Sequence, residues 1–387
     1  MSIRKSVDSF LKQFENEYIP YNLITISRSA LIHNIGVFRN LTKKQVIPVL
    51  KGNAYGHGIE IVAKALKDCD LPYIAVDSYF EALRIREVSR QPVLIMGSIP
   101  PKNFALMNYD NFSFVVSDET TIKTLGETGK PLKVHLECNT GMNRYGAQPG
   151  AVAHLARLIQ GYKTLTLEGV MSHLADADGD SVETVDDAVK LFDSCVDTVL
   201  ATGSKPTLFH IGQTAGSLRT ISRYANVIRP GIGTYGINPF PKEHPLYTRL
   251  HSSLQPALRL TSTITAIVEL KKGEKVGYNY TFKAPEEMRI GVIPIGYYEG
   301  FDRALSNKGL VKIGTAFTQV TGRICMNSSM VSLQSTNAAV GDTVILYSNN
   351  PKDANSINTL AHVHHLFTYE LLVHLNRDVR RVLVDAF

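Results

Sequence analysis

Residues 45–58 read Gln-Val-Ile-Pro-Val-Leu-Lys-Gly-Asn-Ala-Tyr-Gly-His-Gly, an apolar run followed by one lysine and a glycine-rich turn. The apolar half, residues 45–50, has the length and composition of a short buried parallel strand. The glycines permit a tight turn into a helix predicted over residues 59–66. This strand–turn–helix order places Lys51 at the carboxyl end of a strand.

A lysine at such a position can carry chemistry. When it is partly desolvated and near other cations, its neutral amine can form a Schiff base with an aldehyde such as pyridoxal phosphate, or transfer a proton as a base. The alternative is a surface lysine in a flexible loop, which is the commoner case for a lysine considered alone. The groups that accompany Lys51 therefore decide between the two interpretations.

The strand–helix alternation repeats outward from this stretch. Between residue 22 and about residue 235, β-branched runs occur at 23–26, 46–50, 73–76, 93–96, 112–116, 133–136, 167–171, 207–211 and 226–228. Helical periodicity fills gaps between them, for example at 27–40, 118–125, 151–160 and 185–200. This rhythm predicts an α/β fold with a closed (β/α)8 barrel of the TIM type. A doubly wound parallel sheet is the structural alternative.

The pattern changes after residue 250. Strands with few helices between them are predicted at 258–269, 289–295, 320–324, 330–333 and 343–347. Because 387 residues exceed what one hydrophobic core usually supports, we expect two domains, a barrel over residues 1–250 and a mainly β domain over 251–387. Turn-forming residues at 240–251 mark the boundary. Residues 6–17 predict one amphipathic helix.

Composition excludes several classes of protein. The chain has 41 basic and 35 acidic residues and no dense basic run interleaved with aromatic residues, so we expect no nucleic-acid partner. No apolar run reaches transmembrane length, so no membrane partner is expected. The four cysteines, Cys69, Cys138, Cys195 and Cys325, are widely spaced and no secretory leader precedes them, which predicts reduced thiols in a cytoplasmic protein without a metal site.

Polar side chains follow several of the predicted barrel strands, where a barrel enzyme gathers its catalytic groups. They are Lys51 and Tyr55, Arg144, His173, Gln213 and Thr214, and Arg229 with the glycine turn behind it. Each has an ordinary explanation alone, such as a salt-bridge arginine, a core histidine or a helix-capping threonine. Together they supply an amine, guanidiniums, hydroxyls and a turn able to hold a phosphate.

Six ordered motifs add a family resemblance. They are Lys51-Gly52-Asn53-Ala54-Tyr55-Gly56-His57-Gly58, Thr140-Gly141-Met142-Asn143-Arg144, Arg229-Pro230-Gly231-Ile232 with Tyr235-Gly236, Val276-Gly277-Tyr278, Gly296-Tyr297, and Gly322-Arg323-Ile324-Cys325-Met326. Over nearly its whole length the chain resembles the alanine racemases, fold-type III enzymes that use pyridoxal phosphate. Barrel ancestry alone does not explain the last three motifs, because they lie in the β domain.

The resemblance implies roles for the barrel residues. Lys51 would hold pyridoxal phosphate covalently, and its phosphate would be bound by Tyr55, Thr214, Gly231 and Ile232. Arg229 would face the pyridine nitrogen with His173 behind it, and Arg144 would contact the phenolic oxygen or the substrate carboxylate. A guanidinium does not readily give up its proton, so it limits the ring as an electron sink. Decarboxylases of this fold place a carboxylate there instead, so Arg229 favours racemisation.

Racemisation needs a base on each face of the substrate Cα. Lys51 can serve one face. By resemblance, Tyr278 of the partner subunit serves the other, which implies a homodimer with shared active sites. Tyr297 and Met326 of the partner subunit would line the entry corridor and approach the substrate carboxylate.

The chain also departs from the family pattern. Glu137 stands where the family often has a carbamylated lysine that orients Arg144. Asn139 and Asn327 stand where aspartates are usual, Gln213 replaces a common asparagine, and Leu383 stands where a tyrosine is usual. We expect interconversion of L- and D-alanine that supplies D-alanine for peptidoglycan. The alternatives are a racemase of broader range acting on serine or lysine, a decarboxylase, and a noncatalytic pyridoxal-phosphate carrier, a class that lacks the β domain.

Overall fold

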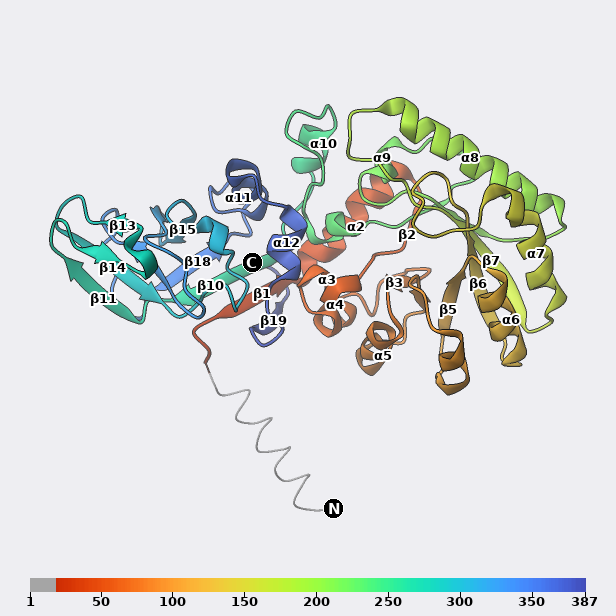
Figure 1. Ribbon diagram of the computed structural model, residues 1–387, viewed down its shortest axis with the longest axis horizontal. Coiled ribbons are helices and arrows are strands. Elements are labelled where there is room, and N and C mark those ends of the chain that lie inside the picture. The colour runs from red at the N-terminus through yellow and green to blue at the C-terminus, as the bar shows by residue number, and fades with distance from the viewer. Residues whose placement is uncertain (1–18) are drawn as a thin grey trace, which may run out of the picture. The chain divides into compact units, whose positions relative to one another are not determined.

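The computed structural model of the protein describes residues 19–387 (Figure 1). The helix predicted over residues 6–17 lies outside the described residues. The chain divides into two compact units. We call residues 26–258, 349–374 and 383–387 the barrel unit, and the segment ending at Thr25 with residues 259–348 and 375–382 the β unit. The division predicted at residues 250 and 251 stays a prediction.

A parallel sheet forms the centre of the barrel unit. Within residues 19–387 it has eight strands in the order β2-β9-β8-β7-β6-β5-β4-β3. Their bounds are β2 Gln45–Val46, β3 Ile74–Val76, β4 Val93–Ile95, β5 Phe112–Val116, β6 Leu132–Glu137, β7 Leu165–Met171, β8 Leu208–His210 and β9 Val227–Ile228. The chain just beyond β2 closes the sheet, because Leu50 N–H donates to Ala75 O at 2.8 Å and Ala75 N–H donates to Pro48 O at 3.0 Å. The predicted TIM-type barrel is confirmed.

The barrel unit has helices after most of these strands and the helix α2 (Arg28–Thr42) before β2. They are α2 Arg28–Thr42, α3 Lys51–Tyr55, α4 Ile59–Ala65, α5 Tyr79–Val88, α6 Glu119–Glu127, α7 Val152–Gly161, α8 Val182–Ala201, α9 Gly216–Arg219 and α10 Tyr247–His251, with α11 Ile357–His364 and α12 Thr368–Val373 added from the C-terminal part of the chain. Short 3-10 turns are η1 Pro101–Leu106, η2 Pro149–Ala151 and η3 Ile232–Tyr235. Figure 1 shows α6, α7 and α8 on the outside of β5 to β7.

Helix α8 shows why these segments are helical. The Ser181 hydroxyl caps its first turn by accepting from Thr184 N–H at 3.3 Å. Its buried apolar residues include Val185, Val189 and Phe192, which recur at helical spacing and so form one stripe.

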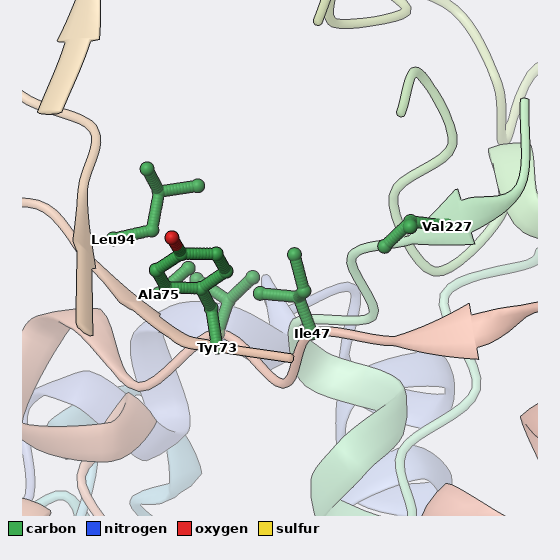
Figure 2. Close-up of a cluster of buried hydrophobic side chains, with 6 residues drawn as sticks. Ile47, Tyr73, Ala75, Leu94 and Val227 are labelled. Atoms are coloured by element: carbon green, nitrogen blue, oxygen red, sulfur yellow. The ribbon is translucent and has the colours of Figure 1, made fainter. Parts of the chain in front are cut away.

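Apolar side chains fill part of the barrel interior. One cluster joins Ile47, Val49, Tyr73, Ala75, Leu94 and Val227, and Figure 2 shows Tyr73 between Ile47 and Leu94. Burying an aliphatic or aromatic side chain of this size contributes about 1.5–3 kcal/mol. The cluster therefore gives the strands a rigid base for the loops at their carboxyl ends.

The β unit is mainly β, as predicted. In the described part of the chain, its largest sheet has the order β16 (Ala316–Gln319), β15 (Leu310–Ile313), β18 (Thr343–Tyr347), β10 (Leu258–Thr263), β1 (Leu23–Ser27) and β19 (Arg380–Val384). A second sheet has the order β11 (Ala266–Leu270), β14 (Met288–Ile293) and β17 (Ser329–Ser332), and β12 (Lys275–Val276) pairs with β13 (Phe282–Lys283). The strand pairs β10–β18, β11–β14 and β14–β17 are antiparallel. Short turns are η4 Tyr278–Tyr280 and η5 Arg303–Leu305.

Three element predictions are wrong. The single strand predicted over 258–269 is two strands, β10 and β11, which belong to different sheets. Residues 23–26 belong to β1, which pairs in the six-stranded sheet and not in the barrel, since the eight later strands already close the barrel. Residues 320–324 form no strand beyond the Val320 bridge to Val331, because Gly322 turns the chain with φ of 76°. The strands β15 and β16, just before that turn, were not predicted.

Candidate active site

One cavity of about 930 Å³ opens at the carboxyl ends of the barrel strands. It is lined by every barrel residue for which the sequence implied a role: Lys51, Tyr55, Arg144, His173, Thr214, Arg229, Gly231 and Ile232. The volume lies in the range of sites that enclose a small molecule or cofactor. Parallel strands explain the convergence, because their carboxyl ends meet at one mouth of a barrel.

Lys51 begins a left-handed turn. The φ angles of Asn53, Ala54 and Tyr55 are 56°, 55° and 49°, and Gly52 before them has φ of 63°. Left-handed backbone costs about 1–2 kcal/mol for each residue that carries a Cβ. The turn therefore needs contacts that hold it. The glycines predicted a tight turn, but they did not predict that its backbone is left-handed.

Two side chains supply those contacts. Glu81 accepts from Gly52 N–H at 2.7 Å through Oε1, and from Asp77 N–H at 3.0 Å through Oε2. Asn53 Oδ1 accepts from Ile59 N–H at 3.1 Å and from Arg84 Nη2 at 3.0 Å. Sequence reasoning missed Glu81. Its signal was Ser78-x-x-Glu81, the capping box that begins α5.

Hydroxyls converge on the glycine turn after β9. Thr214 Oγ1 accepts from Gly231 N–H at 3.0 Å and from Gly233 N–H at 3.1 Å. A Cβ added at Gly231 would lie 2.4 Å from Tyr55 Oη, so the phenol sits directly against this turn. Burial, followed by the charges of nearby acidic groups, raises the pKa of Tyr55, which keeps its phenol protonated and able to donate. The Thr214 hydroxyl and the Tyr55 phenol can both donate at this turn, which suits the binding of a phosphate.

Arg229 is held rigidly, with 2% of its surface exposed. Nη1 donates to His210 Nδ1 and to His210 O, both at 2.7 Å, and Nη2 donates to Ser172 O at 2.6 Å. Burial lowers the pKa of Arg229 to about 10, against the opposing charge of Glu137, so the guanidinium is positive at neutral pH. His210 was not among the predicted site residues. Its signal was its place at the end of the run 207–211.

His173 lines the same cavity as a neutral imidazole. Burial lowers its pKa to about 3, helped by the positive charges of Arg229, Arg144 and Lys51. The resemblance placed His173 behind Arg229, but the hydrogen bonds of that guanidinium go to His210 and Ser172.

Acid is expected to destabilise the fold through His173. Its pKa is about 3 in the folded chain against 6.5 for an ordinary histidine. Between these values the unfolded chain binds a proton that the folded chain excludes, so the stability present above pH 6.5 is lost as the pH falls from about 6.5 to about 3. Urea unfolding at about pH 7 and about pH 4.5 measures the loss.

The variant His173→Gln should lose less stability between these two pH values than the unchanged chain. The exposed His154 is the matched control, and His154→Gln should behave as the unchanged chain does. Equal losses in both variants would contradict the assignment to His173.

Two of the departures from the family pattern, Glu137 and Gln213, line the cavity. Burial there raises the pKa of Glu137, and the charges of Arg229 and Arg144 oppose the rise. Asn139 Oδ1 accepts from Gly141 N–H at 3.0 Å and so shapes the loop that carries Arg144.

Gln213 and Asn327 form local contacts. Gln213 donates to Leu174 O at 3.1 Å, and Asn327 donates to Glu299 Oε1 at 2.7 Å. Leu383 is half-buried in β19 and is not among the residues that line the cavity.

Tyr369 of α12 is a cavity residue that sequence reasoning missed. Its ring centroid lies 6.1 Å from that of Tyr55. Burial, followed by the charge of Asp178, raises the pKa of Tyr369 to about 12. It lies more than 300 residues beyond Tyr55 in the chain, so periodicity offered no signal for the contact.

Glycines bring the three β-unit motifs together. A Cβ at Gly296 would lie 2.2 Å from Cys325 O, so the loop of Tyr297 packs against the loop of Met326. A Cβ at Gly322 would lie 3.1 Å from Val276 O, which joins the loop of Tyr278 to the same group.

Three side chains carried by these loops are strongly exposed. The exposed fractions are 69% for Tyr278, 44% for Tyr297 and 54% for Met326. Large apolar side chains gathered on one exposed surface are typical of an interaction site.

Residues 26–239 match the alanine racemase N-terminal domain, and residues 257–383 match the alanine racemase C-terminal domain. An alanine racemase of Francisella philomiragia subsp. philomiragia is 33% identical over 372 residues, which cover 94% of this chain and 100% of the relative.

Solved structures are also similar. The alanine racemase of Clostridium difficile 630 has a TM-score of 0.86 and 27% identity, over 95% of this chain and 97% of that one. The alanine racemase of Bacillus anthracis with bound L-Ala-P has a TM-score of 0.85 and 25% identity, over 95% and 96%. In this chain, no helix among residues 19–387 is long and apolar enough to cross a membrane.

Proposed function

This chain belongs to the alanine racemase family, a family of pyridoxal-phosphate-dependent isomerases, and from that premise we propose that it interconverts L-alanine and D-alanine with two bases. The observation that carries the proposal is the convergence on one cavity of the residues, from Lys51 to Ile232, for which the family resemblance implied a role. The bases are Lys51 and Tyr278 of the partner subunit.

The donor set fits the cofactor. Tyr55, Thr214 and the turn at Gly231 and Ile232 would hold the phosphate, and the Lys51 amine would hold the aldehyde carbon. When bound, pyridoxal phosphate supplies a conjugated ring that stabilises negative charge at the amino-acid Cα. The tight contact of Tyr55 Oη with Gly231 supports this placement, because any larger side chain at residue 231 would fill the cradle.

Arg229 would face the ring nitrogen as a fixed donor. Its guanidinium is positive at neutral pH and cannot act as an acceptor. It therefore donates without passing on a proton, which restrains charge delocalisation and favours return of the proton to Cα over other reactions. Arg144, on the loop shaped by Asn139, would bind a carboxylate or a phenolate.

The two bases would act on opposite faces of Cα. Lys51 Nζ removes or returns the proton on one face, and the hydroxyl of Tyr278 of the partner subunit does so on the other. We propose a homodimer in which residues 251–387 complete the partner's site, with Tyr297 and Met326 of the partner subunit near the entry. The exposure of these side chains supports this arrangement.

Tyr278→Phe is expected to slow racemisation by about 10²- to 10⁴-fold, because the second general acid–base group is lost. Because the two enantiomers have equal free energies, kcat/KM should fall equally in both directions, while Lys51 should still exchange the Cα proton of the enantiomer whose proton faces it. Tyr280→Phe is the matched control, because Tyr280 is a nearby exposed tyrosine, and it should keep normal rates. Progress curves from L-alanine and from D-alanine measure both rates, and equal rates in the two variants would overturn the role of Tyr278.

We further propose that the enzyme acts in the cytoplasm and supplies D-alanine for peptidoglycan. A racemase of broader range is the alternative, supported by Gln213, Asn139 and Asn327 in place of usual family residues. The match of residues 257–383 to the C-terminal domain argues against a carrier made of a barrel alone.

Solvent deuterium incorporation tests the function. L-alanine, L-serine and L-lysine are incubated separately with the protein and pyridoxal phosphate in deuterated water, and NMR follows the Cα proton. Exchange with formation of D-alanine supports the proposal, and faster exchange with serine or lysine supports the broader racemase. No exchange with alanine, despite bound cofactor, would overturn the proposal.

A further inference from the structure

A line of buried polar side chains leads from Arg229 through the barrel interior to Glu168. Arg229 Nη1 lies 2.7 Å from His210 Nδ1, and His210 Nε2 lies 2.7 Å from His135 Nδ1. His135 Nε2 then lies 3.5 Å from Glu168 Oε2. Both histidines are completely buried.

The chemistry of the two end groups decides which atom donates and which accepts at each contact. A guanidinium only donates, so His210 Nδ1 must accept from Arg229 and its proton must lie on Nε2. That proton points at His135 Nδ1, which must accept, so the His135 proton lies on Nε2 and faces the carboxylate. The carboxylate of Glu168 only accepts, which agrees with every earlier step.

Contacts with Lys133 and Tyr73 hold the Glu168 side chain in position and keep it ionised. Lys133 Nζ lies 2.5 Å from its Oε1, and the Tyr73 hydroxyl donates to its Oε2. Burial alone would raise the pKa of Glu168, but the nearby donors of His135, Lys133 and Tyr73 lower it to about 2. Burial, followed by the charge of Arg229, lowers the pKa of His210, so its ring is neutral with one proton.

Strands β6 and β7 are shaped around this contact. Val134 pairs with Leu167 and His135 pairs with Gly169, so Glu168 is the extra residue at a shift of register. Such bulges re-aim a side chain. A Cβ at Gly169 would lie 2.3 Å from His135 Nδ1, so only glycine leaves room for the imidazole.

We propose that Glu168 and His135 are positioning residues that fix the proton of His210 on Nε2 and thereby hold Arg229 in place for the cofactor. Glu168 is not among the residues that line the active-site cavity, and it borders a separate cavity of about 300 Å³ with Lys133 and Tyr73. The part of the inference that concerns the cofactor rests on the proposed function. The positions of the protons stand independently of it.

Without the carboxylate, the His135 proton can move to Nδ1. His210 must then carry its own proton on Nδ1. That N–H faces the N–H of Arg229, so Nδ1 no longer accepts a hydrogen bond from the guanidinium. The guanidinium loses a charge-assisted hydrogen bond and its fixed orientation. The affinity for pyridoxal phosphate should fall by about 10- to 100-fold, the usual range for such a bond.

The test uses the full chain with 15N-labelled histidine and NMR. In the unchanged protein, the rings of His135 and His210 should both carry the proton on Nε2. Glu168→Leu should give a mixture of tautomers and weaker pyridoxal-phosphate binding in a spectroscopic titration. Glu168→Gln should keep the protons of both histidines on Nε2, because the amide oxygen can still accept. Lys133→Met is a matched control that removes another partner of the same carboxylate.

Two results would overturn the inference: a proton on Nδ1 of either ring in the unchanged protein, or Glu168→Leu with unchanged tautomers and unchanged affinity. If Glu168→Leu does not fold, the spectrum of the unchanged protein still decides which nitrogens carry the protons. Neither readout uses an amino-acid substrate. Correct tautomers in a protein that racemises nothing would therefore overturn the proposed function and leave this inference standing.

Discussion

Lys51→Ala is expected to reduce racemisation of alanine by at least about 10³-fold and to abolish the yellow absorption of covalently held pyridoxal phosphate. The amine is proposed both to hold the cofactor and to serve one face of Cα, so a single substitution removes two functions. The turn that follows Lys51 is held by Glu81 and Asn53.

The measurement is an absorption spectrum after dialysis against pyridoxal phosphate, followed by an assay in each direction. Lys64→Ala is the matched control, because Lys64 is exposed on the nearby helix α4. It should keep both the colour and the activity. Full activity in Lys51→Ala would overturn the two-base assignment.

Gly56→Ala is expected to lower the free energy of unfolding by about 3 kcal/mol or more. Gly56 has φ of 80°, and a Cβ there would lie 1.9 Å from Leu372 O. Backbone cannot swing aside as a flexible side chain can. Either the turn that carries Lys51 or the helix α12 that carries Tyr369 must therefore move.

Gly129→Ala separates the cost of left-handed backbone from the cost of the contact with Leu372 O. Gly129 has φ of 67°, but no atom lies within 4 Å of the Cβ that would be added. It should cost only the strain of left-handed backbone, about 1–2 kcal/mol. Urea unfolding of both variants gives the difference, and equal losses would show that the contact with Leu372 contributes nothing.

The barrel and most of its active-site residues were predictable for a common reason. A parallel barrel strand is a short apolar run, and the residue that follows it lies at the mouth where other strands also end. Reading the first one to three positions past each run therefore found Lys51, His173 and Thr214 without knowledge of any contact. The motifs around Tyr55, Arg144 and Gly231 completed the lining of the cavity.

Other features had weaker local signals. Residues 23–26 look like any barrel strand, because a strand's composition does not state which neighbour it pairs with. The capping box at Ser78 and Glu81 predicted a helix start, but it did not predict that the same carboxylate also binds the turn after Lys51.

By itself, the sequence determined most of the barrel strands, the polar residues that follow them and, through the motifs, the family to which the chain belongs. Only the tertiary structure decided that His210 accepts from Arg229, that Tyr369 lies beside Tyr55, and that the turn after Lys51 is left-handed. The physical reason is that strand and helix patterns depend on neighbours a few residues away. A hydrogen-bond partner or a packed ring depends on which distant segments the closed barrel brings together.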